Sequence, residues 1–172
     1  MIKHPQEYVI LGLLMKGDMH GYEIHHHLCS EFARIWYSGM SHNYALLRRL
    51  EFTKKVISKV EIQNNRPSKK VYSITPEGRE AFLSWIHRPV ERIRALRLEF
   101  LAKLFFMREL EIDGINALIE KQIKICRENL DRIMQRDEIC SDEFDDLVYN
   151  FRRCQIKAIL KWLQGCEKYF RH

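Results

Sequence analysis

The first 88 residues change hydrophobic period twice, and the order of these periods constrains the fold more than any other feature. Apolar residues recur at helical spacing in three successive stretches, at about 5–15, 20–34 and 41–55. From Val56 to Ile62 the period is two, as in a strand, and residues 70–74 repeat it after a run of turn-forming residues. Three helices followed by a β-hairpin are the arrangement of a winged helix-turn-helix.

Capping signals mark the ends of the expected helices. Asp18 is predicted to cap the second helix and Ser41 the third. Thr75-Pro76 predicts the start of a fourth helix, because threonine suits the N-cap and proline the first helical position. Pro89 lies just beyond this helix and is the predicted boundary between two domains.

The second half of the sequence carries only helical patterns, at about 92–109, 112–138 and 142–170. The last of these has two apolar sides, one of which includes Phe144 and Phe151. A helix with two apolar sides needs more than one partner, and a second copy of the chain provides it. The sequence therefore predicts a mainly α fold, with a winged helix-turn-helix over residues 1–88 and a long-helix homodimerisation domain over residues 89–172.

Basic residues gather in one segment of the chain. The net charge is +6, but residues 34–70 alone hold nine basic and two acidic residues. Such a localised excess predicts a polyanion partner, here double-stranded DNA. Amide, imidazole and guanidinium groups on the third helix suit base edges, and a basic hairpin tip suits phosphates. The candidate DNA-contacting residues are Tyr22, Ser41, His42, Asn43, Tyr44, Arg48, Arg49, Arg66, Lys69 and Lys70.

Other function classes find little support. The sequence has no catalytic constellation and no phosphate-cradling glycine loop, so neither an enzyme nor a cofactor is predicted. His25, His26 and His27 are consecutive on a helix and point in directions about 100° apart, so no metal site is predicted. Five cysteines without metal-site spacing, and no signal peptide or membrane span, predict a reducing cytoplasm.

Several motifs together resemble the PadR family of bacterial transcriptional regulators. They are residues 10–14, 20–24, 44–51 and 70–79, with residues 98–104 resembling the start of the helical C-terminal domain of the virulence-activator-like branch. The resemblance implies a cytoplasmic homodimer that binds operator DNA, usually as a repressor. One departure is that Phe52–Val56 lacks the glycine that the family usually has after the recognition helix, so the helix is expected to end without a left-handed residue.

Two alternatives stay open from the sequence. Regulators of this family can bind small aromatic effectors at the junction of their two halves, where Trp36, Tyr37, Phe82 and Trp85 are expected. These aromatic side chains form either an effector pocket or an ordinary interdomain core. The whole chain, in turn, is either a DNA-binding regulator or a helical protein-interaction module on a winged-helix scaffold that no longer binds DNA.

Overall fold

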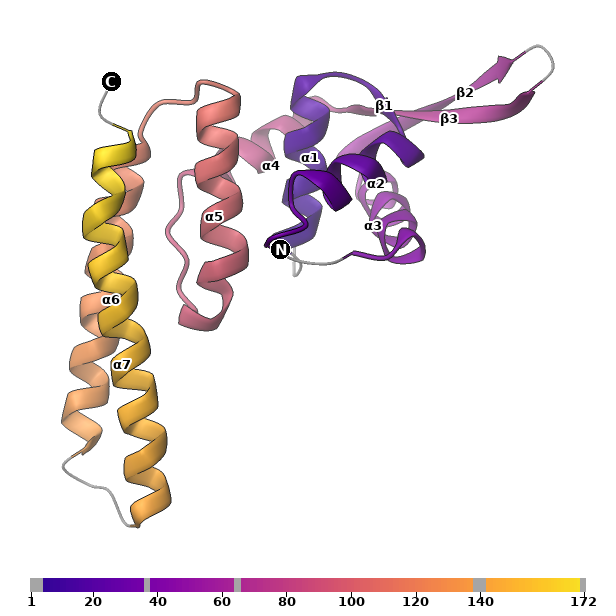
Figure 1. The fold of residues 1–172 in the computed structure, drawn as a ribbon. Helices are drawn as coiled ribbons and strands as arrows, with labels where there is room; N and C mark the ends of the chain where they lie inside the picture. The colour runs from indigo at the N-terminus through magenta and orange to yellow at the C-terminus, as the bar shows by residue number, and fades with distance from the viewer. Residues whose placement is uncertain (1–4, 36–37, 64–65, 138–141, 171–172) are drawn as a thin grey trace. The chain divides into compact units, whose positions relative to one another are not determined.

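The computed structural model describes residues 5–35, 38–63, 66–137 and 142–170 (Figure 1). Their contacts divide the chain into two compact units. The first comprises Met1–His87 with Arg97–Ile112, and the second Arg88–Leu96 with Asp113–His172. Helix α5 (Ile93–Glu109) contributes residues to both units. The division into two functional domains at Pro89 therefore stays a prediction.

The first three predicted helices are present as α1 (Pro5–Lys16), α2 (Gly21–Ser30) and α3 (Met40–Phe52). Both predicted caps were wrong. The N-cap of α2 is His20, whose Nδ1 accepts from the Glu23 amide while Glu23 Oε2 accepts from the His20 amide, so the two residues form a capping box. The N-cap of α3 is Gly39, which has no side chain to accept a bond, and Ser41 lies within the helix.

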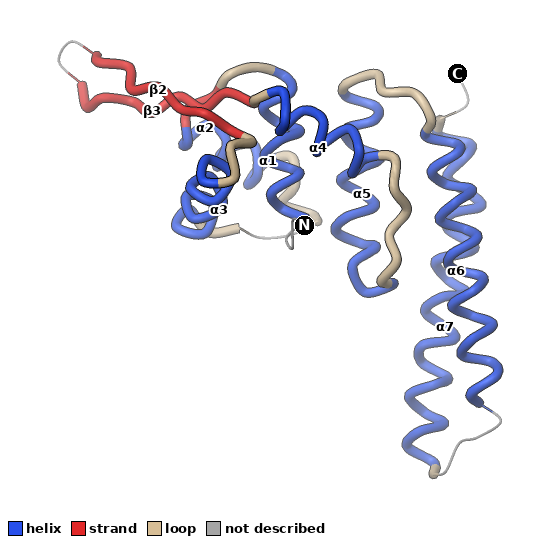
Figure 2. The backbone as a smooth tube through the Cα atoms, turned by 180° about the vertical axis from the view of Figure 1, so that it is seen from behind, coloured by secondary structure: helices blue, strands red, loops and turns tan. Residues whose placement is uncertain are grey.

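The predicted hairpin is β2 (Val56–Gln63) paired antiparallel with β3 (Arg66–Ile74). Figure 2 shows it as a long ribbon reaching beyond the helices of the first unit. The sequence analysis missed β1 (Met19–His20), which pairs with the other edge of β3 to give the order β1-β3-β2. Two residues are too few to show an alternating pattern.

Helix α4 (Pro76–Ile86) begins where the sequence predicts. Thr75 Oγ1 accepts from the Gly78 amide at 3.0 Å, and Pro76 occupies the first turn. Gly78 is required for close packing, because a Cβ at this position would lie 2.1 Å from the backbone oxygen of Lys55. The segment that joins α3 to β2 thus packs directly against the start of α4.

Aromatic side chains from α4, α5 and the segment after α2 fill the core of the first unit. Phe106 lies against Phe32 and Phe82, with ring centroids 5.6 Å away in each case. Its ring also covers Gly12, where a Cβ would meet it at 2.6 Å. Helix α1 therefore approaches α5 as closely as a glycine permits.

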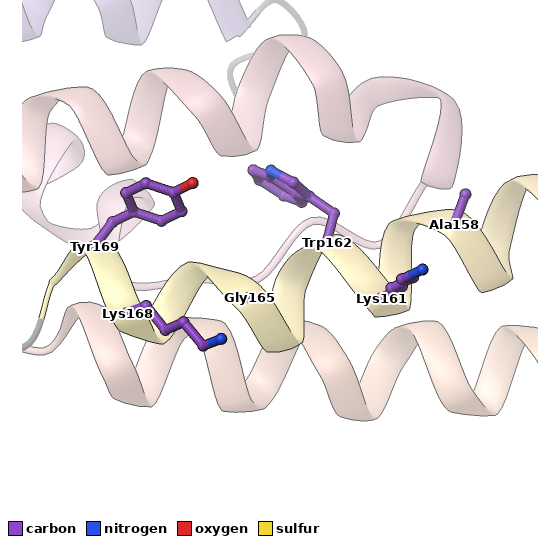
Figure 3. Close-up of a pocket in the computed structure, with 6 residues that line it drawn as sticks. All are labelled: Ala158, Lys161, Trp162, Gly165, Lys168 and Tyr169. Carbon is purple, nitrogen blue, oxygen red and sulfur yellow. The ribbon is translucent and has the colours of Figure 1, made fainter.

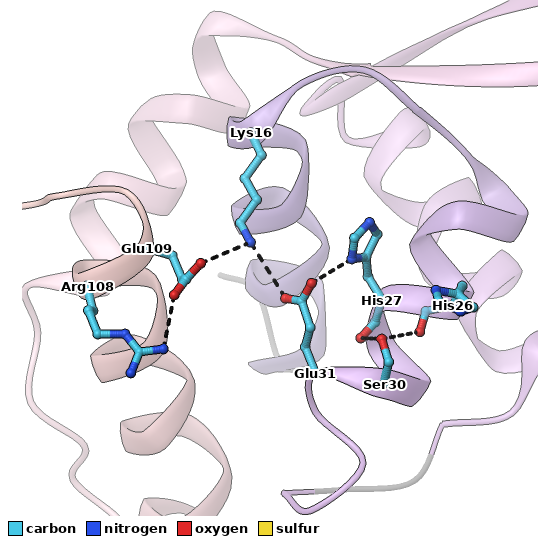
Figure 4. Close-up of polar contacts among 7 residues, drawn as sticks. All are labelled: Lys16, His26, His27, Ser30, Glu31, Arg108 and Glu109. Carbon is cyan, nitrogen blue, oxygen red and sulfur yellow. Dashed lines mark hydrogen bonds and ion pairs between the residues drawn. The ribbon is translucent and has the colours of Figure 1, made fainter.

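A chain of ion pairs ties three elements of this unit together at its surface (Figure 4). Lys16 of α1 lies 3.6 Å from Glu31, which follows α2, and 3.7 Å from Glu109 of α5. Glu31 also accepts a hydrogen bond from His27 Nδ1 at 2.6 Å. One of the three consecutive histidines is thus part of a structural contact.

The second unit is built on an antiparallel hairpin of α6 (Ile115–Asp137) and α7 (Glu143–Cys166), followed by a short 3₁₀ helix, η1 (Glu167–Tyr169) (Figure 1). Gln122 of α6 is buried and bonds both backbone groups of Val90, at 2.6 and 2.9 Å. Fully or nearly fully buried apolar residues line the inner faces of the two helices: Leu118, Ile119, Cys126, Ile133, Ile156, Leu163 and Cys166.

The second apolar side of α7, predicted from the sequence, is largely uncovered. Phe144 and Phe151 are more than two-thirds exposed in this chain. The other exposed large apolar residues of α7 and η1 are Leu147, Val148, Trp162 and Tyr169. Among the described residues, no helix is both long enough and apolar enough to cross a membrane.

Candidate nucleic-acid interface

The outward face of α3 is lined by residues at helical spacing. Ser41, Ala45 and Arg48 are exposed, and Phe52 at the end of the helix is 88 % exposed. Leu46, Leu47 and Leu50 are buried on the opposite side, where they hold the helix against the rest of the first unit. The free face therefore carries a hydroxyl, a guanidinium and apolar groups, a mixture that suits base edges and thymine methyl groups.

Tyr44 lies beside this face and contacts the start of α2. A Cβ on Gly21 would lie 2.6 Å from the Tyr44 ring, so the ring can occupy its place only because residue 21 is glycine. The next residue, Tyr22, is 61 % exposed, with its ring centroid 6.4 Å from that of His20. The glycine-tyrosine motif thus serves two purposes, since one residue makes room for α3 and the other presents a phenol to solvent.

Asn43 does not lie on the outward face, although the sequence analysis includes it among the base-reading residues. Its side chain is 1 % exposed and is held on both sides. The Ser38 hydroxyl donates to Asn43 Oδ1, and Asn43 Nδ2 donates to His25 Nδ1 at 2.8 Å. Because a buried amide with these partners cannot also reach a base, its role in this arrangement is to join α3 to α2.

His42 and Arg49 lie at the edge of the face, on the side next to α1. His42 Nε2 donates to Gln6 Oε1 at 2.6 Å. Arg49 Nε lies 2.6 Å from Glu7 Oε1, and the Glu7 side chain is buried. Two adjacent residues of α1 therefore hold two residues of α3 that are two helical turns apart.

A charged network joins the end of α3 to the hairpin of β2 and β3, which we call the wing. Glu51 accepts from Lys70 Nζ at 2.8 Å and from the Ser58 hydroxyl at 2.5 Å. Partial burial opposes ionisation of Glu51, but the hydrogen bonds from Lys70 and Ser58 and the charge of Lys70 lower its pKa. The bond to Glu51 in turn raises the pKa of Lys70. Lys70 is therefore a link between helix and hairpin.

The remaining candidate DNA-contacting residues of the wing are Lys69 and Arg66. Lys69 lies on β3 with its side chain partly exposed. Arg66 begins β3, but its side chain lies outside the part of the molecule that the structure describes. Lys59 of β2 is exposed and adds a further cation to the hairpin.

The end of α3 differs from the sequence expectation. Lys54 has a φ of 56°, so the left-handed residue is present although it is not glycine. The Lys55 amide bonds the Leu50 carbonyl at 2.9 Å, and the Lys54 carbonyl accepts from the Thr75 hydroxyl at 2.8 Å. The expectation that α3 ends without a left-handed residue was therefore wrong, because the surrounding hydrogen bonds hold Lys54 in this conformation.

The structure gives no support to an effector pocket around Phe82 and Trp85. Both side chains are buried in the first unit. The Trp85 ring stacks on Tyr8 with centroids 4.8 Å apart, and its Nε1 donates to Glu99 at 2.9 Å. Lys103 Nζ lies 4.8 Å from the Trp85 ring centroid and 2.9 Å from Glu99. Trp36 and Tyr37 lie outside the described residues.

An open groove lies instead in the second unit, on α7 and η1, with a volume of about 770 Å³. The rings of Trp162 and Tyr169 project from the same side, with Gly165 between them (Figure 3). Ala158, Lys161 and Lys168 complete its lining. Elsewhere, the described part of the chain holds no group of three or more His, Cys, Asp or Glu side chains able to bind a metal ion.

Three residues that organise this surface were missed from the sequence: Gln6, Glu7 and Glu51. A signal existed for Glu7, because it is in phase with the buried Leu11 and Leu14 of the same helix. An acidic residue on the buried side of a helix needs a cationic partner, and the nearby basic helix supplies one.

Comparison with known proteins agrees with the fold and the motifs. The model of the transcriptional regulator PadR-like family matches residues 10–84. A second model, described as virulence activator alpha C-term, matches residues 96–171. The first match spans the winged helix-turn-helix from α1 to α4, and the second spans the long C-terminal helices.

Individual relatives point the same way. The negative transcriptional regulator PadR of Bacillus subtilis (strain 168) is 28 % identical over 120 residues, which are 69 % of this chain and 65 % of the relative. The probable transcriptional regulator Rv1176c of Mycobacterium tuberculosis is 30 % identical over 87 residues, 51 % of this chain and 46 % of the relative. The chain thus spans less than two thirds of the length of these relatives.

A solved structure of B. subtilis PadR, in complex with operator DNA, has the same fold. It superposes with a TM-score of 0.51 at 24 % identity, over 95 % of this chain and 97 % of that one. The family is one of regulators and not of enzymes. Motifs, fold and family models together establish that this chain belongs to the PadR-like family of transcriptional regulators.

Proposed function

We propose that the chain binds operator DNA as a homodimer in the cytoplasm and represses transcription there. The observation that carries this proposal is the outward face of α3, which presents Ser41 and Arg48 beside a basic hairpin. A protruding helix with a wing beside it is the shape that enters a major groove and follows the neighbouring backbone. The B. subtilis relative solved with operator DNA supports the same use of the fold.

The proposed contacts follow from exposure. Ser41, Tyr44 and Arg48 read base edges, and Arg48 can bind guanine bidentately. Lys69 and the neighbouring cations of the wing contact phosphates, and the exposed Tyr22 phenol adds a backbone contact from α2. Asn43 supports these residues from within the protein, and Lys70 supports them through its bond to Glu51.

We propose that the exposed side of α7 forms the dimer contact. Phe144, Leu147 and Phe151 recur at helical spacing along α7, and Phe144 and Phe151 are each more than two-thirds exposed. A contiguous apolar stripe of this length is unfavourable in water, and a second copy of the same stripe would cover it. The residues after Pro89 are thus the proposed dimerisation domain.

Fluorescence anisotropy with labelled promoter-length DNA tests the proposal. Wild-type protein is expected to bind, and Arg48→Ala to weaken binding by roughly tenfold or more, since a bidentate arginine contributes about 1–3 kcal/mol. Arg79→Ala is the matched control, because Arg79 is exposed on α4 and belongs to neither α3 nor the hairpin. Equal losses in the two variants, or no binding by the wild type, would favour the protein-interaction module instead.

We further propose a small aromatic carboxylate as effector, bound in the groove on α7. Trp162 and Tyr169 provide ring faces, and Lys161 and Lys168 provide charges for an acid group. The relative B. subtilis PadR has been solved with p-coumaric acid. A panel of phenolic acids should raise the melting temperature of the wild type and not of Trp162→Ala. No shift with any member of the panel would exclude this class of effector.

A further inference from the structure

The first turn of α1 holds the edge of the recognition helix, and the contact between Glu7 and Arg49 is its charged part. Arg49 Nε lies 2.6 Å from Glu7 Oε1. The Glu7 side chain is 3 % exposed, whereas that of Arg49 is 41 % exposed. One end of the guanidinium is thus anchored in the protein, and the rest of the group reaches solvent.

The geometry points to Glu7 as a positioning residue that directs Arg49 toward a DNA phosphate, and this inference rests on the proposed DNA binding. The contact with Glu7 is made by Nε, and the Arg49 side chain as a whole is 41 % exposed. A guanidinium presents its donors in a rigid fork. Anchoring Nε therefore aims the terminal pair outward in one direction, at a lower entropic cost on binding than for a free arginine.

The position of Arg49 on α3 decides in favour of a phosphate and against a base. Ser41, Ala45 and Arg48 define the middle of the outward face, and Arg49 lies at its edge beside α1. A side chain at the edge of a helix that lies in the major groove meets the wall of the groove, which is the sugar-phosphate backbone. Arg48 and Arg49, although adjacent, thus have different roles.

The neighbouring contact supports the same role for α1. His42 lies two turns before Arg49, on the same side of α3, and Gln6 holds it at 2.6 Å. The hydrogen bond to Gln6 and the ion pair with Glu7 thus oppose rotation of α3 about its axis. Unlike Gln6, Glu7 carries a negative charge, which by itself repels DNA. Removing this charge therefore changes DNA affinity in one direction if Glu7 only repels DNA, and in the other direction if it positions Arg49.

Glu7→Gln removes a negative charge near the proposed DNA surface. Coulomb repulsion alone predicts tighter binding for this variant, whereas a positioning role predicts weaker binding. We expect roughly tenfold weaker binding, the effect of losing one well-placed charged hydrogen bond. The slope of log K against log salt should fall by about one, as for the loss of one phosphate contact. Glu61→Gln is the charge control, because Glu61 is exposed on β2.

Binding is measured by the fluorescence anisotropy of two labelled DNA duplexes, each about three helical turns long (about 30 base pairs). One duplex is selected by the protein from a random-sequence library, and the other is unrelated to it in sequence. A phosphate contact carries no sequence information, so Glu7→Gln should weaken binding to both duplexes by similar factors. Arg49→Lys keeps the charge and can keep the pair with Glu7, but lacks the fork. Arg49→Lys should therefore lose as much affinity for DNA as Glu7→Gln. The double variant, which combines Glu7→Gln with Arg49→Lys, should lose no more affinity than either single variant.

The outcomes are distinct. Tighter or unchanged binding by folded Glu7→Gln, or additive losses in the double variant, would overturn the positioning role while leaving the proposed function intact. Loss confined to the selected duplex would overturn the phosphate assignment and make Arg49 a base contact. Absence of binding by the wild type would overturn the proposed function itself. Circular dichroism melts of each variant establish that the protein measured is folded.

Discussion

The ring of Tyr44 lies so close to Gly21 that a Cβ on residue 21 would be 2.6 Å from the ring. This contact brings the start of α2 against α3. It explains why a glycine stands at the first position of a helix, where its conformational freedom is otherwise a cost. The helix-turn-helix geometry therefore depends on the absence of one methyl group.

Gly21→Ala should displace Tyr44 and destabilise the fold by about 1–3 kcal/mol, the usual cost of inserting a methyl group into a packed contact. Urea unfolding measures the change. Gly165→Ala is the control, because a Cβ there meets no atom within 4 Å and the residue lies inside α7. That variant should gain about 0.5–1 kcal/mol from helix propensity. A neutral or stabilising Gly21→Ala would show that the close contact does not constrain the helix pair.

Lys54→Gly should stabilise the protein. Lys54 has a φ of 56°, which costs a non-glycine residue about 1–2 kcal/mol, and the greater freedom of glycine in the unfolded chain offsets part of the gain. The expected net change is about 0.5–1 kcal/mol. Lys55→Gly, at a neighbouring position without positive φ, should instead lose stability. If the two variants changed in the same direction, the strain assigned to Lys54 would be wrong.

The bridge between Glu51 and Lys70 predicts a particular pH dependence. The pKa of Glu51 is lowered from 4.5, so its contribution is fully present above that value and is lost as pH falls through the lower folded-state pKa. The pKa of Lys70 is raised from 10.5, so its contribution is present below that value and is lost as pH rises through the higher one.

The stability difference between wild type and Glu51→Gln should therefore be constant near neutral pH and shrink in acid. Urea unfolding across a pH series gives this difference directly. Ser58→Ala in the same series tests the second hydrogen bond to Glu51, and should reduce the acid dependence without abolishing it. A difference that persists unchanged well below pH 4.5, the ordinary value for this carboxyl, would mean that ionisation of Glu51 does not support the wing.

Phe151→Glu should convert the proposed dimer to a monomer, since it places a charge in the middle of the exposed stripe on α7. Sedimentation equilibrium measures the change in mass. Gln164→Glu adds the same charge at an exposed position about 200° around the helix from the stripe, and should remain dimeric. Monomeric wild type, or dimeric Phe151→Glu, would place the dimer contact elsewhere.

Local signals carried much of the fold prediction. Thr75-Pro76 predicted the start of α4, and the alternation after Lys55 predicted the hairpin, because capping and strand periodicity are properties of neighbouring residues. The short strand β1 could not be predicted, since its pairing with Val71 and Tyr72 brings together segments about fifty residues apart. The apolar sides of α7 were read from helical spacing alone.

The site was harder to predict, because its contacts join different elements. Asn43 was read as a base contact from its chemistry, although its phase with Leu46, Leu47 and Leu50 places it on the buried side of α3. The pair of Glu7 and Arg49 joins residues 42 positions apart and leaves no local pattern. Residue type indicated what the surface binds, whereas the three-dimensional arrangement decides which side chains are free to bind it.

The central claim is tested most directly by selecting duplexes from a random-sequence library with the purified protein and measuring their affinity against salt. The account predicts an enriched inverted repeat whose half-sites lie about one helical turn apart, as a homodimer with two recognition helices requires. Its affinity should fall steeply with salt and be weakened by Arg48→Ala but not by Arg79→Ala. Recovery of no common sequence, with equally weak binding to every duplex, would contradict the claim.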